Sequence, residues 1–161
     1  METKALYIHI PFCDHICSYC DFAKVYYREE FVLKYLERLK EELNALPHHI
    51  MRTIYIGGGT PSALSLKQLD ILLSMVDPFV GDDTLEYTIE VNPESATLDK
   101  LECMHTHGVN RISAGVQTFN NDLLKKRNVH FSKKSERSTF FTIQKTENIS
   151  RHCYSRCQSL F

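Results

Sequence analysis

Short apolar runs alternate with helical stripes through residues 6–116, and this alternation limits the possible folds more than any other feature. Runs of β-branched and aromatic residues predict strands, whereas apolar residues three or four positions apart predict helices. The predicted strands are residues 6–10, 53–56, 87–91 and 111–116. The first predicted helix has a stripe that stops before Pro47 and comprises Val32, Leu36, Leu39, Leu43 and Leu46.

Two further helices are predicted from their termini. Ser65 followed by Gln68 forms a capping box, and Leu64 and Leu69 are spaced as a hydrophobic staple. Thr97 is expected to cap the third helix, and Gly108 lies where a left-handed residue usually ends one.

Strands that alternate with helices form right-handed β-α-β units around a parallel sheet. We therefore expect an α/β fold with about four β/α units. In barrels built from such units, the loops at the carboxyl ends of the strands converge on one site. The unusual clusters all follow predicted strands, and they are the cysteine loop, residues 57–61, residues 90–93 and residues 115–119.

Cys13, Cys17 and Cys20 form a C-x3-C-x2-C triplet directly after the first predicted strand. Three thiolates can ligate three irons of a [4Fe-4S] cluster and leave the fourth iron open for a small molecule. Zinc is the alternative, with His9 or His15 completing a Cys3His set. A disulfide is disfavoured because no apolar signal segment precedes the triplet and the chain has the features of a cytosolic protein.

The other clusters are less specific when taken singly. Residues 57–59 are consecutive glycines, which let backbone groups approach a ligand closely but also suit a plain tight turn. Glu90 is placed to accept hydrogen bonds from ribose hydroxyls or to form an ordinary strand-end ion pair. Gln117 offers an amide at the mouth of the fourth strand.

Composition supplies only bounds on function. A formal net charge of −1 gives no general basic excess for binding nucleic acid, and no apolar segment is long enough to cross a bilayer. We expect a cytoplasmic protein with no nucleic-acid partner.

Taken together, four motifs resemble the radical S-adenosylmethionine (SAM) superfamily and its coproporphyrinogen dehydrogenase-like branch. The motifs are the segment 6–13 with its cysteine spacing, Ile-Gly-Gly-Gly-Thr-Pro at 56–61, Ile-Glu-Val-Asn-Pro at 89–93, and residues 108–119. Their order and spacing agree over residues 5–126. The resemblance implies a partial TIM barrel, of which this chain would form a truncated part.

The resemblance also implies cofactors and their contacts. Members hold a [4Fe-4S] cluster on the three cysteines, here Cys13, Cys17 and Cys20, and bind SAM at the fourth iron. An electron from the cluster then cleaves SAM to a 5′-deoxyadenosyl radical. Matching positions for SAM contacts are Tyr7, Tyr19, Gly58, Gly59, Thr60, Glu90 and Gln117.

The residues after Cys20 separate two groups within this branch. Coproporphyrinogen dehydrogenases carry another cysteine two positions later, whereas this chain has Asp21 and Phe22, as in the heme chaperone group. The resemblance therefore implies a heme or porphyrin partner and favours heme binding and transfer. Oxygen-independent coproporphyrinogen III oxidase activity and a nonfunctional gene fragment are the alternatives, so whether the chain is an enzyme stays open.

The family pattern weakens after residue 126. We expect residues 1–126 to form part of the barrel core, residues 127–150 a degraded fourth helix and strand opening, and residues 151–161 an aberrant tail. Val129 stands where relatives carry a SAM-contacting arginine, and Arg127 precedes Asn128 instead. The abrupt loss predicts a frameshift or internal stop. Cys103 is expected to be a small buried side chain, and His105 and His107 to be polar residues at a helix end.

Overall fold

A computed structural model of the chain describes residues 4–17, 20–47 and 49–115. Within these residues a four-stranded parallel sheet has the order β1-β4-β5-β6. Its strands are β1 (Ala5–Ile10), β4 (Thr53–Gly58), β5 (Glu86–Val91) and β6 (Arg111–Ala114). A short parallel pair, β2 (Phe12–Cys13) with β3 (Val25–Tyr26), lies in the cysteine region. The predicted α/β class with a parallel sheet is confirmed.

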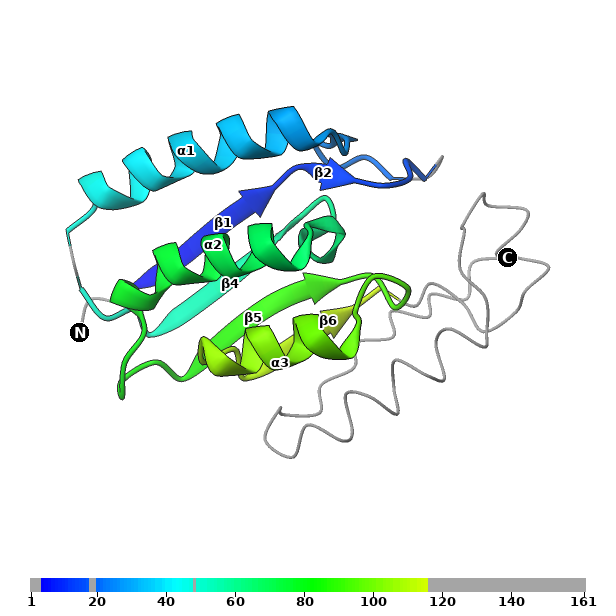
Figure 1. The fold of residues 1–161 in the computed structure, drawn as a ribbon. Helices are drawn as coiled ribbons and strands as arrows, with labels where there is room; N and C mark the ends of the chain where they lie inside the picture. The colour runs from blue at the N-terminus through cyan, green and yellow to red at the C-terminus, as the bar shows by residue number, and fades with distance from the viewer. Residues whose placement is uncertain (1–3, 18–19, 48, 116–161) are drawn as a thin grey trace.

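Three helices connect the strands and cover one face of the sheet, as Figure 1 shows. They are α1 (Glu29–Ala45), α2 (Leu66–Val76) and α3 (Leu98–Thr106). The 3-10 turns η1 (Pro61–Ala63) and η2 (Asp77–Phe79) flank α2. No described helix combines the length and apolarity that crossing a bilayer requires.

The core lies between the sheet and the helices because successive strand side chains point to opposite faces. Buried positions alternate in β1 and β4 at Ile8, Ile10, Ile54 and Ile56. They pack in one hydrophobic cluster with buried leucines of α1 and α2. Complete burial of each such side chain stabilises the fold by about 1.5–3 kcal/mol.

The other face of the sheet is polar. Its side chains contact one another directly: Tyr7 stacks on Tyr55, and Arg111 forms an ion pair with Glu86 at 3.1 Å. We refer to Tyr7, His9, Tyr55, Glu86, Glu90 and Arg111 as the polar face. Its presence explains why the strands alternate rather than being apolar throughout.

The helix termini follow the sequence predictions with two corrections. Ser65 and Gln68 form the predicted capping box, and Gly108 has a φ of 83°. Thr97 occupies the N-cap of α3, but its hydroxyl donates to the Asp99 carboxylate instead of accepting from a backbone amide. The nearby charged acceptor wins this competition. Leu46 was predicted in the stripe of α1, yet it follows the helix end and is exposed.

Two more predictions can be compared with the structure. Cys103 is only half-buried, because its thiol lies at the α2–α3 surface within 3.8 Å of an Asp70 carboxylate oxygen. The fourth strand ends at Ala114 instead of residue 116. The predicted units 127–150 and 151–161 lie outside the described residues.

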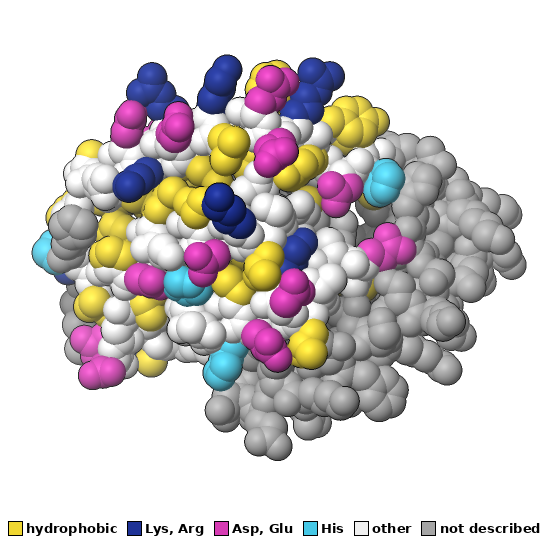
Figure 2. All heavy atoms as spheres, viewed as in Figure 1, with side chains coloured by type: hydrophobic (Ala, Val, Ile, Leu, Met, Phe, Trp, Pro, Cys, Tyr) yellow, Lys and Arg dark blue, Asp and Glu magenta, His cyan; other side chains and the backbone are white. Residues whose placement is uncertain are grey.

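Figure 2 shows positive and negative side chains intermixed over the helix-covered face, with apolar side chains between them.

Candidate functional site

A pocket of about 570 Å³ opens at the carboxyl ends of the parallel strands. This volume falls in the range of about 300–1,000 Å³ typical of small-molecule sites. All four predicted loop clusters contribute to it. Its lining includes Cys13, His15, Cys17, Cys20, Asp21, Phe22, Lys24, Gly58, Gly59, Thr60, Glu90, Val91, Asn92, Ser113, Ala114 and Gly115. The expectation that these loops converge on one site is confirmed.

Cys13 is held by the glycine turn that follows the neighbouring strand. The Gly59 amide donates to the Ile10 carbonyl and the Thr60 amide to the Phe12 carbonyl, both at 2.8 Å. The Cys13 sulfur also lies 3.4 Å from the Thr60 hydroxyl. The backbone that leads into the first thiol is therefore paired with the turn.

The far end of the cysteine loop is tied back to β1. His9 donates from Nε2 to the Ala23 carbonyl at 2.8 Å, because a carbonyl oxygen can only accept. Its Nδ1 consequently accepts from the Tyr7 hydroxyl at 3.0 Å. Both ring nitrogens of His9 thus have protein partners, which argues against His9 as the fourth ligand of a zinc site. His15 does line the pocket.

Lys24 closes the loop after the third cysteine. Its ammonium donates to the carbonyls of Cys20 and Phe22. The backbone amides of Val25 and Tyr27 donate to Pro11 and Cys13 across the β2–β3 pair, at 2.8 and 2.9 Å. A positive charge is therefore fixed beside the thiols.

The Cys13 thiol is shielded from solvent and is 6% exposed. Burial raises its pKa, the hydrogen bond with Thr60 lowers it, and negative charge on Cys20 and Cys17 raises it further. The net pKa is above the usual value, so the thiol keeps its proton at neutral pH. A metal ligated here must displace that proton, which makes its affinity depend on pH.

Two glycines of the turn are required by close approach. Gly58 has a φ of 113°, and a Cβ there would lie 2.5 Å from the His9 ring. A Cβ on Gly59 would lie 2.7 Å from the Pro11 carbonyl carbon. The glycines therefore let the turn pack against β1 and the start of the cysteine loop, while Gly58 and Gly59 still line the pocket.

Glu90 joins the pocket to the polar face. One carboxylate oxygen accepts from the Tyr55 hydroxyl at 2.5 Å, and the other accepts from the Gly58 amide at 3.0 Å. These neutral donors replace the strand-end ion pair that was the alternative. Burial, together with the hydrogen bond and charge of Glu90, raises the pKa of Tyr55 to about 12.

A second group of polar contacts joins the end of β5 to the glycine turn at the pocket. The Asn92 side chain donates to the Thr60 hydroxyl at 3.5 Å, and its backbone amide donates to the Ser62 hydroxyl at 2.9 Å. Ser62 and Ser95 hydroxyls lie 2.6 Å apart, and Lys100 donates to the Ser62 carbonyl. These contacts connect the end of β5 to the glycine turn and fix the orientation of Thr60.

The structure brings together most of the predicted site residues. Those lining the pocket are Cys13, Cys17, Cys20, Gly58, Gly59, Thr60 and Glu90. Tyr7 lies on the polar face and reaches Glu90 only through Tyr55, with 6.0 Å between the two tyrosine ring centroids. Tyr19 and Gln117 lie outside the described residues, so their predicted roles stay untested.

Sequence reasoning missed Tyr55 and the anchoring role of His9, and it included Asn92 in the cluster at 90–93 without giving it a role of its own. Tyr55 could have been found, because it alternates with Ile54 and Ile56 and must share a face with Tyr7. The partner of His9 could not, since Ala23 is fourteen residues away and has no distinctive side chain.

A sequence profile of the radical SAM superfamily matches residues 7–139 of this chain. The chain belongs to the radical SAM superfamily. The match covers all three loop cysteines, the glycine turn and Glu90, which are the parts that line the pocket.

Several radical SAM relatives are similar over the same part of the chain. Heme chaperone HemW of Lactococcus lactis is 50% identical over 126 residues, covering 78% of this chain and 33% of the relative. HemW of Bacillus subtilis is 44% identical over 129 residues, covering 76% and 34%. Oxygen-independent coproporphyrinogen III oxidase of Pseudomonas aeruginosa is 36% identical over 130 residues, covering 75% and 28%. The chain thus spans about a third of the length of these relatives.

Solved radical SAM structures support the fold. Coproporphyrinogen III oxidase (HemN) from Escherichia coli superimposes with a TM-score of 0.79 at 29% identity, covering 89% of this chain and 35% of that one. The radical SAM methyltransferase TsrM from Kitasatospora setae gives 0.57 at 13% identity, covering 89% and 29%, and shows the fold alone. The expected partial barrel architecture of this superfamily is therefore confirmed for the described strands and helices.

Proposed function

We propose that this chain carries the cofactor-binding part of a HemW-type heme chaperone. It would bind a [4Fe-4S] cluster through Cys13, Cys17 and Cys20 and bind SAM in the same pocket. The observation that carries this proposal is that the three thiols, the glycine turn and Glu90 line one pocket at the carboxyl ends of the strands.

The residues present fit a cluster with one open iron. Three cysteines supply three thiolates, and the fixed ammonium of Lys24 next to Cys20 offsets part of their negative charge. His9 is occupied at both ring nitrogens, so it adds no fourth ligand to the three thiolates. When bound, the cluster supplies an electron to SAM.

The remaining pocket residues would position SAM. The Glu90 carboxylate lies at the pocket edge, where hydroxyl groups of a ribose can share its oxygens with Tyr55 and the Gly58 amide. Thr60 is held by Asn92 and the Cys13 thiol, so its hydroxyl has a fixed orientation beside the first ligand. These groups would orient the nucleoside and exclude water from it.

Two observations favour heme handling over coproporphyrinogen oxidation. Asp21 follows Cys20 and Phe22 stands where a further cysteine is expected in the oxidase group. Phe22 is 70% exposed and lines the pocket mouth, where it provides apolar area instead of a thiol. The oxidase remains the second candidate because the HemN fold superimposes on most of the chain.

Anaerobic reconstitution with iron and sulfide tests cluster binding. We expect a broad charge-transfer absorption and about four irons and four sulfides per chain. Cys17→Ser should abolish both, whereas Cys103→Ser, a matched loss of one thiol outside the pocket, should leave them unchanged. Colourless protein, or equal loss in the two variants, would sink the proposal and favour a nonfunctional fragment.

SAM and heme binding are tested on the reconstituted protein. We expect SAM to change the cluster's electron paramagnetic resonance spectrum, and Glu90→Gln to weaken SAM binding while leaving the iron content intact. A heme titration should show saturable binding. Decarboxylation of coproporphyrinogen with SAM and a reductant tests the second candidate, and its detection would replace heme transfer as the function.

A further inference from the structure

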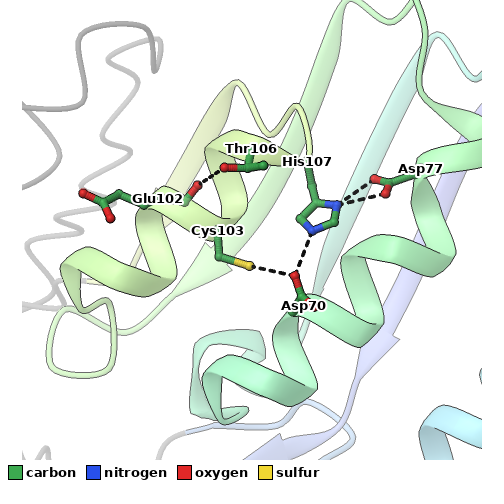
Figure 3. A network of polar contacts seen from close by, with 6 residues as sticks. All are labelled: Asp70, Asp77, Glu102, Cys103, Thr106 and His107. Atoms are coloured by element: carbon green, nitrogen blue, oxygen red, sulfur yellow. Dashed lines mark hydrogen bonds and ion pairs between the residues drawn. The ribbon is translucent and has the colours of Figure 1, made fainter.

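A second set of ligand-type side chains lies between α2 and α3, outside the cysteine pocket. The ligand atoms of Asp70, Cys103 and His107 all lie within 4.8 Å of one another. Figure 3 shows Cys103 and His107 converging on Asp70 across the gap between the helices. Asp70 of α2 provides an oxygen ligand, and Cys103 and His107 at the carboxyl end of α3 provide sulfur and nitrogen ligands.

His107 is oriented by a fourth residue. Its Nδ1 lies 2.8 and 3.0 Å from the two carboxylate oxygens of Asp77, and a carboxylate can only accept, so Nδ1 carries the proton. A carboxylate on the far nitrogen of a metal-ligating histidine is the usual second partner that fixes the tautomer. The Nε2 atom then faces Asp70.

The contact between Nε2 and Asp70 needs a positive charge. Nε2 lies 3.2 Å from Oδ1 of Asp70, and a neutral ring would place a lone pair against a carboxylate oxygen. Either a second ring proton or a cation resolves this repulsion. The Cys103 sulfur, 3.8 Å from the same Asp70 oxygen, faces the same point.

The core cluster that includes the buried residues of α2 and α3 also contains Tyr87. The hydroxyl of Tyr87 on β5 is fully buried and has no hydrogen-bond partner among the described residues. Burial, with negative charge on Asp77 and Cys103, raises the pKa of Tyr87. An unsatisfied polar group there costs about 1–3 kcal/mol unless something accepts from it or donates to it.

We propose that Asp70, Cys103 and His107 form a binding site for a Zn²⁺ ion. Tetrahedral zinc with bonds of about 2.0–2.3 Å places ligand atoms about 3.3–3.6 Å apart. The two contacts at Asp70 Oδ1, 3.2 and 3.8 Å, bracket these edges. The Cys103 sulfur and a ring nitrogen of His107 also lie within 4.8 Å of each other.

The ligand types select the metal. Thiolate and imidazole suit zinc, whereas Mg²⁺ and Ca²⁺ prefer oxygen ligands alone. An ion can enter from solvent because the Asp70 side chain is 61% exposed, while the ring of His107 is 13% exposed and held in place. Three protein ligands leave a fourth position for water.

Metal titration of the full chain tests this site. With Co²⁺ as the probe, we expect Cys103→Ser and His107→Gln each to remove one equivalent of bound metal and part of the thiolate-to-cobalt absorption. His105→Gln is the matched control, because His105 lies on the same helix, is exposed and is outside the set. Zn²⁺ should displace Co²⁺ at the same stoichiometry.

Asp70→Asn tests the site even if Cys103→Ser or His107→Gln unfolds the protein. The Asp70 side chain is on the surface, so its substitution should leave the fold intact. It should weaken Co²⁺ binding at this site at least tenfold while circular dichroism stays unchanged. Binding of the same number of equivalents with the same spectrum in wild-type protein and all three variants would overturn the proposal. His107 would then be a doubly protonated ring between two carboxylates.

Discussion

The two thiol-bearing regions of this protein are assembled in different ways. In the cysteine loop, three thiols come from one eight-residue segment, Cys13 to Cys20, and their spacing in the sequence is enough to predict the site. Between α2 and α3, a thiol and an imidazole from the end of α3 meet the Asp70 carboxylate only because the two helices pack together. Local motifs reveal the first kind of site, whereas tertiary packing alone reveals the second.

The regions also treat their carboxylates differently. Glu90 accepts from two neutral donors, the Tyr55 hydroxyl and the Gly58 amide. Asp70 instead faces the Nε2 atom of His107, whose other nitrogen already donates to Asp77. The first arrangement is complete in the protein alone. The second needs a proton or a metal ion, and the following predictions test this contrast.

The largest expected effect is a reciprocal loss of metals. Cys17→Ser should remove nearly all iron and sulfide from reconstituted protein but retain the zinc equivalent between the helices. Cys103→Ser should do the opposite. Elemental analysis of both variants measures this directly, and a variant that loses both metals would show that the two regions are not independent.

Gly58→Ala should be the most damaging single-methyl addition. Its φ of 113° strains any other residue, at about 1–3 kcal/mol, and the new Cβ would also strike the His9 ring. Urea unfolding measures the loss. Gly81→Ala is the control, because its Cβ would meet only the Ile50 side chain, at 3.0 Å. Equal losses in the two variants would contradict the structural reading of the glycine turn.

Two tyrosine substitutions should differ in their effect on stability. Tyr55→Phe removes a hydrogen bond to an ionised carboxylate and should cost about 1.5–3 kcal/mol. Tyr87→Phe removes a buried hydroxyl that has no described partner and should be neutral or stabilising by about 1 kcal/mol in metal-free protein. Unfolding at neutral pH measures both free-energy changes. Similar losses in the two variants would contradict the difference between a hydrogen-bonded Tyr55 hydroxyl and an unpartnered Tyr87 hydroxyl.

The raised pKa of Tyr55 adds a pH dependence. The folded protein holds this proton up to about pH 12, whereas the unfolded chain releases it near the ordinary value of 10.0. Between these values the folded state binds more protons, so stability must fall as pH rises. Tyr55→Phe should flatten this part of the stability curve. An unchanged slope would mean that the proton is not retained.

The smallest effects concern the caps of α2 and α3. Ser65→Ala breaks a capping box and should cost about 1 kcal/mol. Thr97→Ala should cost only a few tenths of that, because the Thr97 hydroxyl bonds to Asp99 instead of a backbone amide. Thermal unfolding of the two variants compares the two losses. A larger loss in Thr97→Ala than in Ser65→Ala would contradict the hydrogen bonds that the structure shows at the two caps.

Sequence patterns predicted those features that depend on near neighbours. The strand alternation, the Ser65–Gln68 box and the left-handed Gly108 are all local, and the structure confirms them. The convergence of loops at the pocket was also predictable, because parallel strands end at one edge of a sheet. Thr97 shows the limit, since its hydroxyl can accept from a backbone amide or donate to Asp99, and the sequence does not say which contact forms.

The missed features depend on which surfaces pack together. His107 was expected to be a polar residue at a helix end, which it is, but its carboxylate partners lie thirty and thirty-seven residues earlier in the chain. The same reason hides the bond from His9 to Ala23 and the one from Tyr55 to Glu90. No periodicity in the sequence encodes a pairing between separate elements.

The shielding of Cys13 bears on how the loop survives exposure to oxygen. Oxidants attack the thiolate, and this thiol is buried with a raised pKa, so it should react slowly in cofactor-free protein. Mass spectrometry after a brief peroxide pulse should find Cys13 modified after Cys17 and Cys20. A chain that has lost its cofactor would then keep one intact ligand from which repair can begin.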